Sequence, residues 1–260
     1  MKQHTPHDSA ILLRRSRKVI SDPLSRPKHR EAFGILMSLA RAGNYEAEYD
    51  VALCYELGDG VRRSLKKAAE WYTKAAQHGC LDAMHNIGVF YEHGTGVSRD
   101  AAMAAKWYRR AATAGFADSQ HNLGYLYLTG NGAKRSTSIA RQWFLRAAIQ
   151  GIVESQFNLA LIYDEGIGTA RNEEEAIKWY REAAGRGDIP SMANLGHLLC
   201  FGSLSVLSPR EGAEYLKRAT ASNDLVAMHN LAKCFATGIG VRKNARKANE
   251  LEERLAQLAR

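Results

Sequence analysis

Apolar and small side chains recur along most of this chain at the spacing of one face of an α-helix. Ser119, Leu123, Gly124 and Tyr127 show the pattern, because their spacing places all four on the same side. Gly124 keeps that side flat, so a neighbouring helix can approach closely. The equivalent small residues elsewhere are Gly88, Ala160 and Gly196.

A second helix is predicted after each such segment. A Gly-x-Gly ends the first helix, because glycine accepts the left-handed conformation at low cost. The second helix carries a Trp-aromatic pair and then Ala-Ala, which we expect to pack inward with the tryptophan in the core. A residue suited to capping a helix N-terminus precedes each second helix. These predicted caps are Ser64, Asp100, Ser136, Asn172, Ser208 and Asn244.

The whole pattern repeats every 36 residues. The tryptophans Trp71, Trp107, Trp143 and Trp179 follow this period, as do the Gly-x-Gly pairs. Six repeats fit without a gap, at 45–80, 81–116, 117–152, 153–188, 189–224 and 225–260. The fifth repeat departs from the pattern at Leu204, which replaces the second glycine, so we expect its loop to differ.

One helix pair cannot bury its apolar face alone, whereas stacked pairs can. The sequence therefore predicts an all-α fold, an α-solenoid in which antiparallel helix pairs form a right-handed superhelix. Residues 30–44 match a second helix without its partner and are predicted to cap the N-terminal end. The strongly charged last helix, from Ala245, is predicted to cap the other end.

The recurring residues resemble the Sel1-like repeat family, which is similar to tetratricopeptide repeats. The second repeat carries the resemblance most fully, and the fifth and sixth depart from it. The resemblance implies an adaptor or scaffold role in assembling complexes and does not imply one reaction or one ligand. The residues that carry it in the second repeat are Ala83, Ile87, Gly88, Tyr91, Gly94, Gly96, Val97, Asp100, Trp107, Tyr108, Ala111, Ala112 and Gly115.

We expect the other face of the first helices to line a concave groove that binds a protein or peptide. An asparagine ladder runs along it, with Asp50 at the equivalent position of the first repeat. An asparagine can hold the backbone of an extended peptide, or it can bond the loop of the preceding repeat, and both interpretations stay open. The ladder consists of Asn86, Asn122, Asn158, Asn194 and Asn230.

Other positions on this face vary between repeats and would set the choice of partner. They include aromatic and histidine residues, namely His85, His121, Tyr125, Phe157 and His197. An acidic residue begins the first helix in four repeats, at Glu46, Asp82, Asp118 and Glu154. The acids either attract a basic or amphipathic partner or complement the helix dipole. No small-molecule substrate is expected.

No metal, cofactor or catalytic site is expected. The histidines of neighbouring first helices are about 8–10 Å apart, too far for one zinc ion without leaning together. The four cysteines form no C-x-x-C pair and are predicted to be free, mostly buried thiols. Ser64-Leu65-Lys66-Lys67 has the form S-x-x-K, but Ser64 stands at the cap position, so we expect no enzyme activity.

Residues 1–29 contain seven basic and two acidic residues and are predicted to form a flexible arm. The alternative function rests on this arm: Arg14, Arg15, Arg17 and Lys18 would attach a regulator to nucleic acid or an anionic membrane. With 45% hydrophobic and 24% charged residues and a net charge of +9, the composition is that of a globular protein. We expect a cytoplasmic location, because no apolar run resembles a membrane span or secretory signal.

Overall fold

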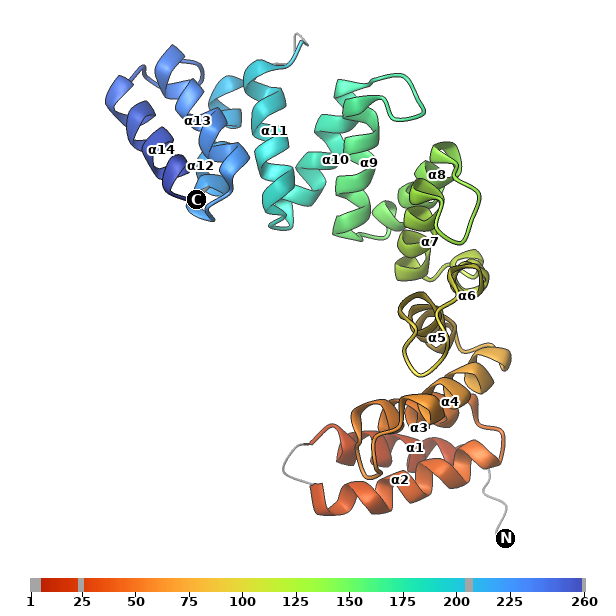
Figure 1. Ribbon diagram of the computed structural model, residues 1–260. Helices are drawn as coiled ribbons and strands as arrows, with labels where there is room; N and C mark the ends of the chain where they lie inside the picture. Colours follow the sequence, from red (N-terminus) through yellow and green to blue (C-terminus); the bar gives the residue numbers. More distant parts are fainter. Residues whose placement is uncertain (1–5, 23–25, 204–207, 259–260) are drawn as a thin grey trace. The chain divides into compact units, whose positions relative to one another are not determined.

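The computed structural model describes residues 6–22, 26–203 and 208–258, and every regular element in them is an α-helix (Figure 1). None of these helices is long and apolar enough to cross a membrane. The helices are α1 (Pro6–Ile20), α2 (Arg26–Arg41), α3 (Tyr45–Leu57), α4 (Leu65–Gln77), α5 (Leu81–His93), α6 (Ala101–Thr113), α7 (Ala117–Thr129), α8 (Thr137–Ile149), α9 (Val153–Glu165), α10 (Glu173–Gly185), α11 (Ile189–Phe201), α12 (Pro209–Ala221), α13 (Leu225–Thr237) and α14 (Ala245–Leu258).

The helices divide into two compact units, Met1–Ser136 and Thr137–Arg260. In the N-terminal unit each helix from α1 to α7 packs on the next along the chain. The C-terminal unit continues in the same way from α8 to α14, and α11 also packs on α13. The predicted alternation of first helices (α3, α5, α7, α9, α11, α13) and second helices (α4, α6, α8, α10, α12, α14) is therefore confirmed, and it is that of an α-solenoid.

The predicted helix ends agree with the structure in most repeats. The side chains of Ser64, Asp100, Asn172 and Asn244 each accept a hydrogen bond from the backbone N–H three residues later. Ser208 is the residue that caps α12, as predicted, but its side chain accepts no such hydrogen bond. The first glycine of the Gly-x-Gly adopts the left-handed conformation at the end of α3, α5, α7, α9 and α13.

The aromatic residue after each tryptophan, rather than the tryptophan, forms the centre of the core. Tyr72, Tyr108, Phe144 and Tyr180 are completely buried. Trp107 and Trp179 are buried as predicted, whereas Trp71 and Trp143 keep part of their surface exposed. A basic side chain lies over the ring of each tryptophan, as with Lys74 at 4.8 Å from the Trp71 ring centre. The three others are Arg110, Arg146 and Lys178.

Two glycine positions allow the close helix approach that the sequence predicts. A Cβ atom added to Gly88 would lie 2.6 Å from the Tyr108 ring, so this glycine admits the buried tyrosine of the same repeat. A Cβ on Gly96 would lie 2.4 Å from the backbone oxygen of Leu65, the first residue of the second helix one repeat earlier. The second glycine of the Gly-x-Gly therefore sets the spacing between consecutive repeats.

The N-terminal segment differs from the flexible arm expected for residues 1–29, because residues 6–20 form α1, which packs on α2. Leu13 and Ser16 are buried, at 6% and 2% exposure. Ser16 stands two repeat lengths before Gly88, so α1 occupies the place of a first helix. The capping segment 30–44 thus lies within a helix pair and has a partner. Sequence reasoning missed that partner because α1 is not followed by a Gly-x-Gly.

The cysteines agree with the sequence-based prediction. Cys54, Cys80, Cys200 and Cys234 are all free and buried. Burial raises the pKa of the Cys54 thiol to about 12. A thiol with so high a pKa carries little thiolate at neutral pH, so Cys54 is expected to be unreactive.

The glycine contact between repeats gives a stability prediction with a matched control. Gly96→Ala is expected to lower the free energy of unfolding by about 3 kcal/mol or more, for two reasons. The added Cβ would clash with the Leu65 carbonyl oxygen, and the positive φ at this position is unfavourable for alanine. Gly79→Ala, also at positive φ but with no atom within 4 Å of the added Cβ, is expected to cost about 1–2 kcal/mol. Urea denaturation measures both, and equal losses would contradict the spacing role of Gly96.

Candidate functional site

The residues predicted to line a groove all lie on first helices, and they are divided between the two compact units. On the N-terminal unit α5 carries His85 and Asn86, and α7 carries His121, Asn122 and Tyr125. On the C-terminal unit α9 carries Phe157 and Asn158, α11 carries Asn194 and His197, and α13 carries Asn230. The structure therefore presents two sets of predicted site residues, one on each unit.

The asparagine ladder bonds to the buried tyrosines of the preceding second helices. Asn194 donates its side-chain N–H to the hydroxyl of Tyr180 at 3.1 Å. Asn122 takes the equivalent place beside Tyr108, from the first helix of the next repeat. Of the two interpretations left open by the sequence, the internal bond is present at these positions, but it goes to a core tyrosine and not to a loop. The side-chain oxygen of each asparagine still has capacity to accept a bond.

The same tyrosines donate to acids that the sequence analysis did not single out. Tyr72 donates to Glu56 at 2.6 Å and Tyr108 donates to Glu92 at 2.7 Å. Burial, and then the bond to the carboxylate, raises the pKa of both tyrosines far above the ordinary value, so they are protonated. The sequence does contain a signal for these pairs. In the third repeat Phe144 replaces the tyrosine and Leu128 replaces the acid, so hydroxyl and carboxylate are absent together.

The predicted aromatic and histidine positions lie partly buried over the same core tyrosines. The ring centre of His85 is 5.7 Å from that of Tyr108, and His85 Nδ1 lies 3.0 Å from Ser119 Oγ. Burial lowers the pKa of His85, which favours its neutral form at pH 7. Phe157 takes the equivalent place over Tyr180, with ring centres 6.0 Å apart. Both rings are therefore only partly accessible to a ligand.

Two other predicted residues are more accessible. Tyr125 is 49% exposed on α7, and the neighbouring His121 is partly buried. His197 is exposed on α11, and its Nδ1 lies 3.4 Å from the side-chain oxygen of Asn230 on α13. Asn230 itself is 7% exposed and therefore offers little surface. Tyr125 and His197 are thus the most accessible of the aromatic and histidine side chains predicted to bind a partner.

The acids that begin the first helices differ in their surroundings. Glu46 is bound by Arg17 of α1, whose guanidinium lies 3.0 Å from it and 2.7 Å from Asp50. Asp82, Asp118 and Glu154 are exposed. The sequence analysis placed Arg17 in an electrostatic arm, whereas this side chain pairs with acids of its own chain.

Within the part of the chain that the structure describes, no group of three or more His, Cys, Asp or Glu side chains lies close enough to hold a metal ion. Ser64, the serine of the S-x-x-K sequence, accepts a hydrogen bond from the Lys67 backbone N–H at 3.4 Å and caps α4. Its hydroxyl therefore has the structural role that the repeat position predicts.

The Sel1 repeat matches residues 46–80, 81–116, 117–152, 153–188, 189–224 and 225–258. The chain belongs to the Sel1 repeat family. These bounds agree with the six repeats read from the sequence to within two residues at either end. Sel1 repeat proteins are in general scaffolds for protein–protein interaction, and their repeat fold is typically non-catalytic.

Two solved structures of Sel1-type proteins are similar over most of this chain. The crystal structure of a Sel1 repeat protein from Oxalobacter formigenes is 28% identical, with a TM-score of 0.72, and the match covers 95% of this chain and 99% of that one. The second, c5321, is a protective antigen present in uropathogenic Escherichia coli strains and displays an SLR fold. It is 26% identical with a TM-score of 0.62, over 95% of this chain and 61% of that one. A comparison with curated proteins gave no match.

The fifth Sel1 repeat has its own way of fixing the loop after its first helix. Gly202 has φ −65° and ψ 175°, so α11 does not end in the left-handed conformation of the other first helices. Leu204, which replaces the second glycine, lies outside the described residues. The predicted difference in this loop is therefore confirmed at Gly202.

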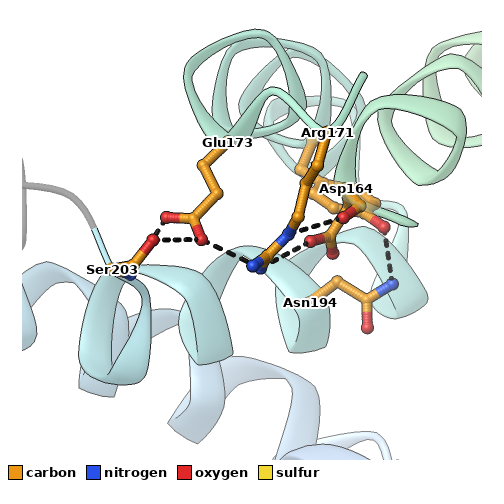
Figure 2. Close-up of polar contacts among 6 residues, drawn as sticks. Asp164, Arg171, Glu173, Asn194 and Ser203 are labelled. Carbon is orange, nitrogen blue, oxygen red and sulfur yellow. Dashed lines mark hydrogen bonds and ion pairs between the residues drawn. The ribbon is translucent and has the colours of Figure 1, made fainter. Parts of the chain in front are cut away.

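A buried glutamate from the preceding repeat holds this loop (Figure 2). Glu173 begins α10 and is 7% exposed, and its carboxylate accepts from the Ser203 hydroxyl at 2.7 Å and the Ser203 backbone N–H at 3.0 Å. Arg171 lies 2.9 Å from Glu173 and donates to the backbone oxygen of Asp164 at 2.8 Å. Glu173 is the first residue of α10, the position that the second glycine of the next repeat contacts elsewhere in the chain. Here its bonds to Ser203 connect the two consecutive repeats instead.

The tyrosine–acid pair gives a stability prediction that is patterned on the third repeat, where both members of the pair are replaced. Tyr108→Phe alone is expected to lower the free energy of unfolding by about 1–2 kcal/mol, because Glu92 loses its donor. Adding Glu92→Leu, which reproduces Leu128 and Phe144, is expected to restore most of that loss. Urea denaturation of the two single variants and the double variant measures the coupling. Additive losses would contradict the pairing.

Proposed function

We propose that this protein is a non-catalytic adaptor that binds a protein or peptide segment along its first helices. Tyr125 carries the proposal, because a tyrosine ring that is 49% exposed beside His121 and Asn122 has the character of an interface anchor. The family supports the general class, since Sel1 repeat proteins are interaction scaffolds. The concave groove and the particular residues are part of the proposal.

The two sets of first-helix residues have different chemistry. On the N-terminal unit α5 and α7 combine His85, His121 and Tyr125 with the exposed acids Asp82 and Asp118. On the C-terminal unit Phe157 and Asn158 follow the exposed acid Glu154 on α9, whereas α11, which carries Asn194 and His197, contains no acid. The acidic character supports a basic or amphipathic partner for the N-terminal unit.

The asparagines bond to the core and keep hydrogen-bonding capacity for a partner. At Asn194 one amide N–H is used by Tyr180, which leaves the second N–H and the amide oxygen to bond a partner. A peptide backbone, which both donates and accepts hydrogen bonds, suits this capacity.

The alternative role, attachment to nucleic acid or an anionic membrane, rests on α1. Arg14, Arg15 and Lys18 are exposed there, but Arg17 is paired with Glu46 and Asp50. The internal pairing reduces the charge that α1 offers to an anionic partner. The adaptor therefore remains the function that the geometry supports best.

Affinity purification with mass spectrometry, followed by a titration of the recovered partner, tests the adaptor. Tyr125→Ala is expected to weaken binding about tenfold, as loss of an exposed aromatic anchor does. Ile149→Ala is the control, because Ile149 is 71% exposed but lies on a second helix, and it is expected to leave binding within about twofold. His121→Ala and Phe157→Ala extend the scan to both units.

Three outcomes of that titration are informative. Loss of binding with Tyr125→Ala or His121→Ala places the partner on the N-terminal unit, and loss with Phe157→Ala places it on the C-terminal unit. If all three variants bind as well as the unchanged chain, the groove proposal is wrong. If only replacing Arg14, Arg15 and Lys18 by glutamine abolishes binding, the partner is attached through α1 and the alternative role takes its place.

A further inference from the structure

The N-terminal unit already shows how its first helices bind an arginine. Arg17 of α1 donates from Nε to Asp50 at 2.7 Å and from Nη1 to Glu46 at 3.0 Å. Glu46 and Asp50 stand one helical turn apart on α3, so a single guanidinium reaches both. A planar guanidinium with several N–H donors is well suited to such a pair.

The same two positions recur on the next two first helices. On α5 they are occupied by Asp82 and Asn86, and on α7 by Asp118 and Asn122. Both acids are exposed. Each pair therefore offers one carboxylate and one amide oxygen where α3 offers two carboxylates.

The bond of Asn194 shows how the ladder is oriented, because its amide nitrogen donates to Tyr180 and its amide oxygen is directed away from that hydroxyl. Asn86 and Asn122 stand at the equivalent positions and interact with Tyr72 and Tyr108. In the C-terminal unit the position equivalent to Arg17 is occupied by His197 and, one repeat later, by Lys233. The Nδ1 atom of His197 lies 3.4 Å from the side-chain oxygen of the ladder residue Asn230. The side-chain oxygen of Asp50 or of a ladder asparagine is thus contacted by the polar side chain at the position of Arg17, where there is one.

The neighbouring first helix offers no arginine to α5 or α7 at this position, and its nearest polar group to Asp82 and Asn86 is the Tyr49 hydroxyl on α3. The residues that correspond to Arg17 are Leu53, which precedes Asn86, and Val89, which precedes Asn122. Their side chains cannot donate a hydrogen bond. The acid–asparagine pairs therefore lack the internal arginine that occupies the equivalent pair on α3.

The charge of these helices favours a cationic ligand. Helices α3, α5 and α7 contain Asp and Glu residues but no Lys or Arg. A guanidinium that approaches Asp82 or Asp118 thus meets no Lys or Arg side chain of these three helices. The acids are Glu46, Glu48, Asp50, Glu56, Asp82, Glu92 and Asp118.

We propose that the pairs Asp82–Asn86 and Asp118–Asn122 each bind an arginine side chain of a basic segment in the partner protein. Packed helices lie about 8–10 Å apart, which an extended chain spans in about three residues. The segment therefore carries two arginines separated by two other residues. This inference rests on the adaptor function and specifies the chemistry of the partner at the N-terminal unit.

A short peptide with two arginines at that separation in a Gly-Ser-Ala background serves as the probe. Nitrogen–proton NMR of the full chain follows the side-chain amides of Asn86 and Asn122 during titration and also gives the affinity. Both amide signals are expected to shift with this peptide. A peptide with citrulline in place of both arginines keeps the shape and loses the charge, so it is expected to leave the signals in place.

Isosteric variants give the energetic test. Asp82→Asn and Asp118→Asn are each expected to weaken binding of the arginine peptide about three- to fivefold, and about tenfold or more together. Glu70→Gln removes the same charge from an exposed position on α4 and is expected to change affinity less than about twofold. Thermal unfolding followed by circular dichroism confirms that the variants remain folded.

The outcomes separate this inference from the adaptor function. If the arginine and citrulline peptides bind equally, or if the aspartate variants match Glu70→Gln, the arginine inference is overturned. Should Tyr125→Ala still weaken binding of the natural partner in that case, the adaptor function stands without it. If neither the aspartate variants nor Tyr125→Ala affect the natural partner, both proposals fail.

Discussion

The structure depends on the absence of one side-chain atom, the Cβ of a glycine, in every repeat but the fifth. The second glycine of the Gly-x-Gly lies against the first turn of the second helix one repeat earlier, so close that a Cβ on Gly132 would come within 2.1 Å of the Ala101 oxygen. A similar approach at Gly60 brings the third helix close to α2 through His29. Because consecutive helix pairs meet at this distance, alanine-rich second helices can pack against them. The fifth repeat lacks this glycine, and a bond between Glu173 and Ser203 connects the two repeats instead.

The glycine in the middle of the first helix allows a tyrosine to be buried, and the tyrosine hydroxyl needs hydrogen-bond partners in the core. Completely buried tyrosines such as Tyr108 fill the space opened by Gly88, but each brings a hydroxyl into the core. A glutamate one residue before the end of the first helix accepts from that hydroxyl, and an asparagine from the next repeat interacts with it. A buried polar group costs free energy unless it is paired, so glutamate, tyrosine and asparagine form one structural set. The ladder therefore stabilises the stack and, with its remaining oxygen, forms part of the surface.

Charge is separated between the two layers of the N-terminal unit. Among the charged residues, α3, α5 and α7 carry only acids, whereas α6 carries only the bases Lys106, Arg109 and Arg110. Part of this charge is used internally, as where Lys74 lies 3.1 Å from the buried Glu48 while its ammonium stays near Trp71. Arg17 likewise pairs with Glu46 and Asp50. The charges that remain exposed on α5 and α7 give this face its acidic character.

The sequence alone determined the helices, the repeat length, most of the caps and the free cysteines, because these features follow from local spacing and from the conformational preferences of single residues. It also placed the predicted site residues on first helices. Only the tertiary structure decided which contacts those residues make. Whether Asn194 faces a loop, a peptide or Tyr180, whether Arg17 is free or paired, and whether α1 packs as a helix all depend on residues a repeat or more away. Such contacts are set by how closely neighbouring helices pack, and no local pattern records that distance.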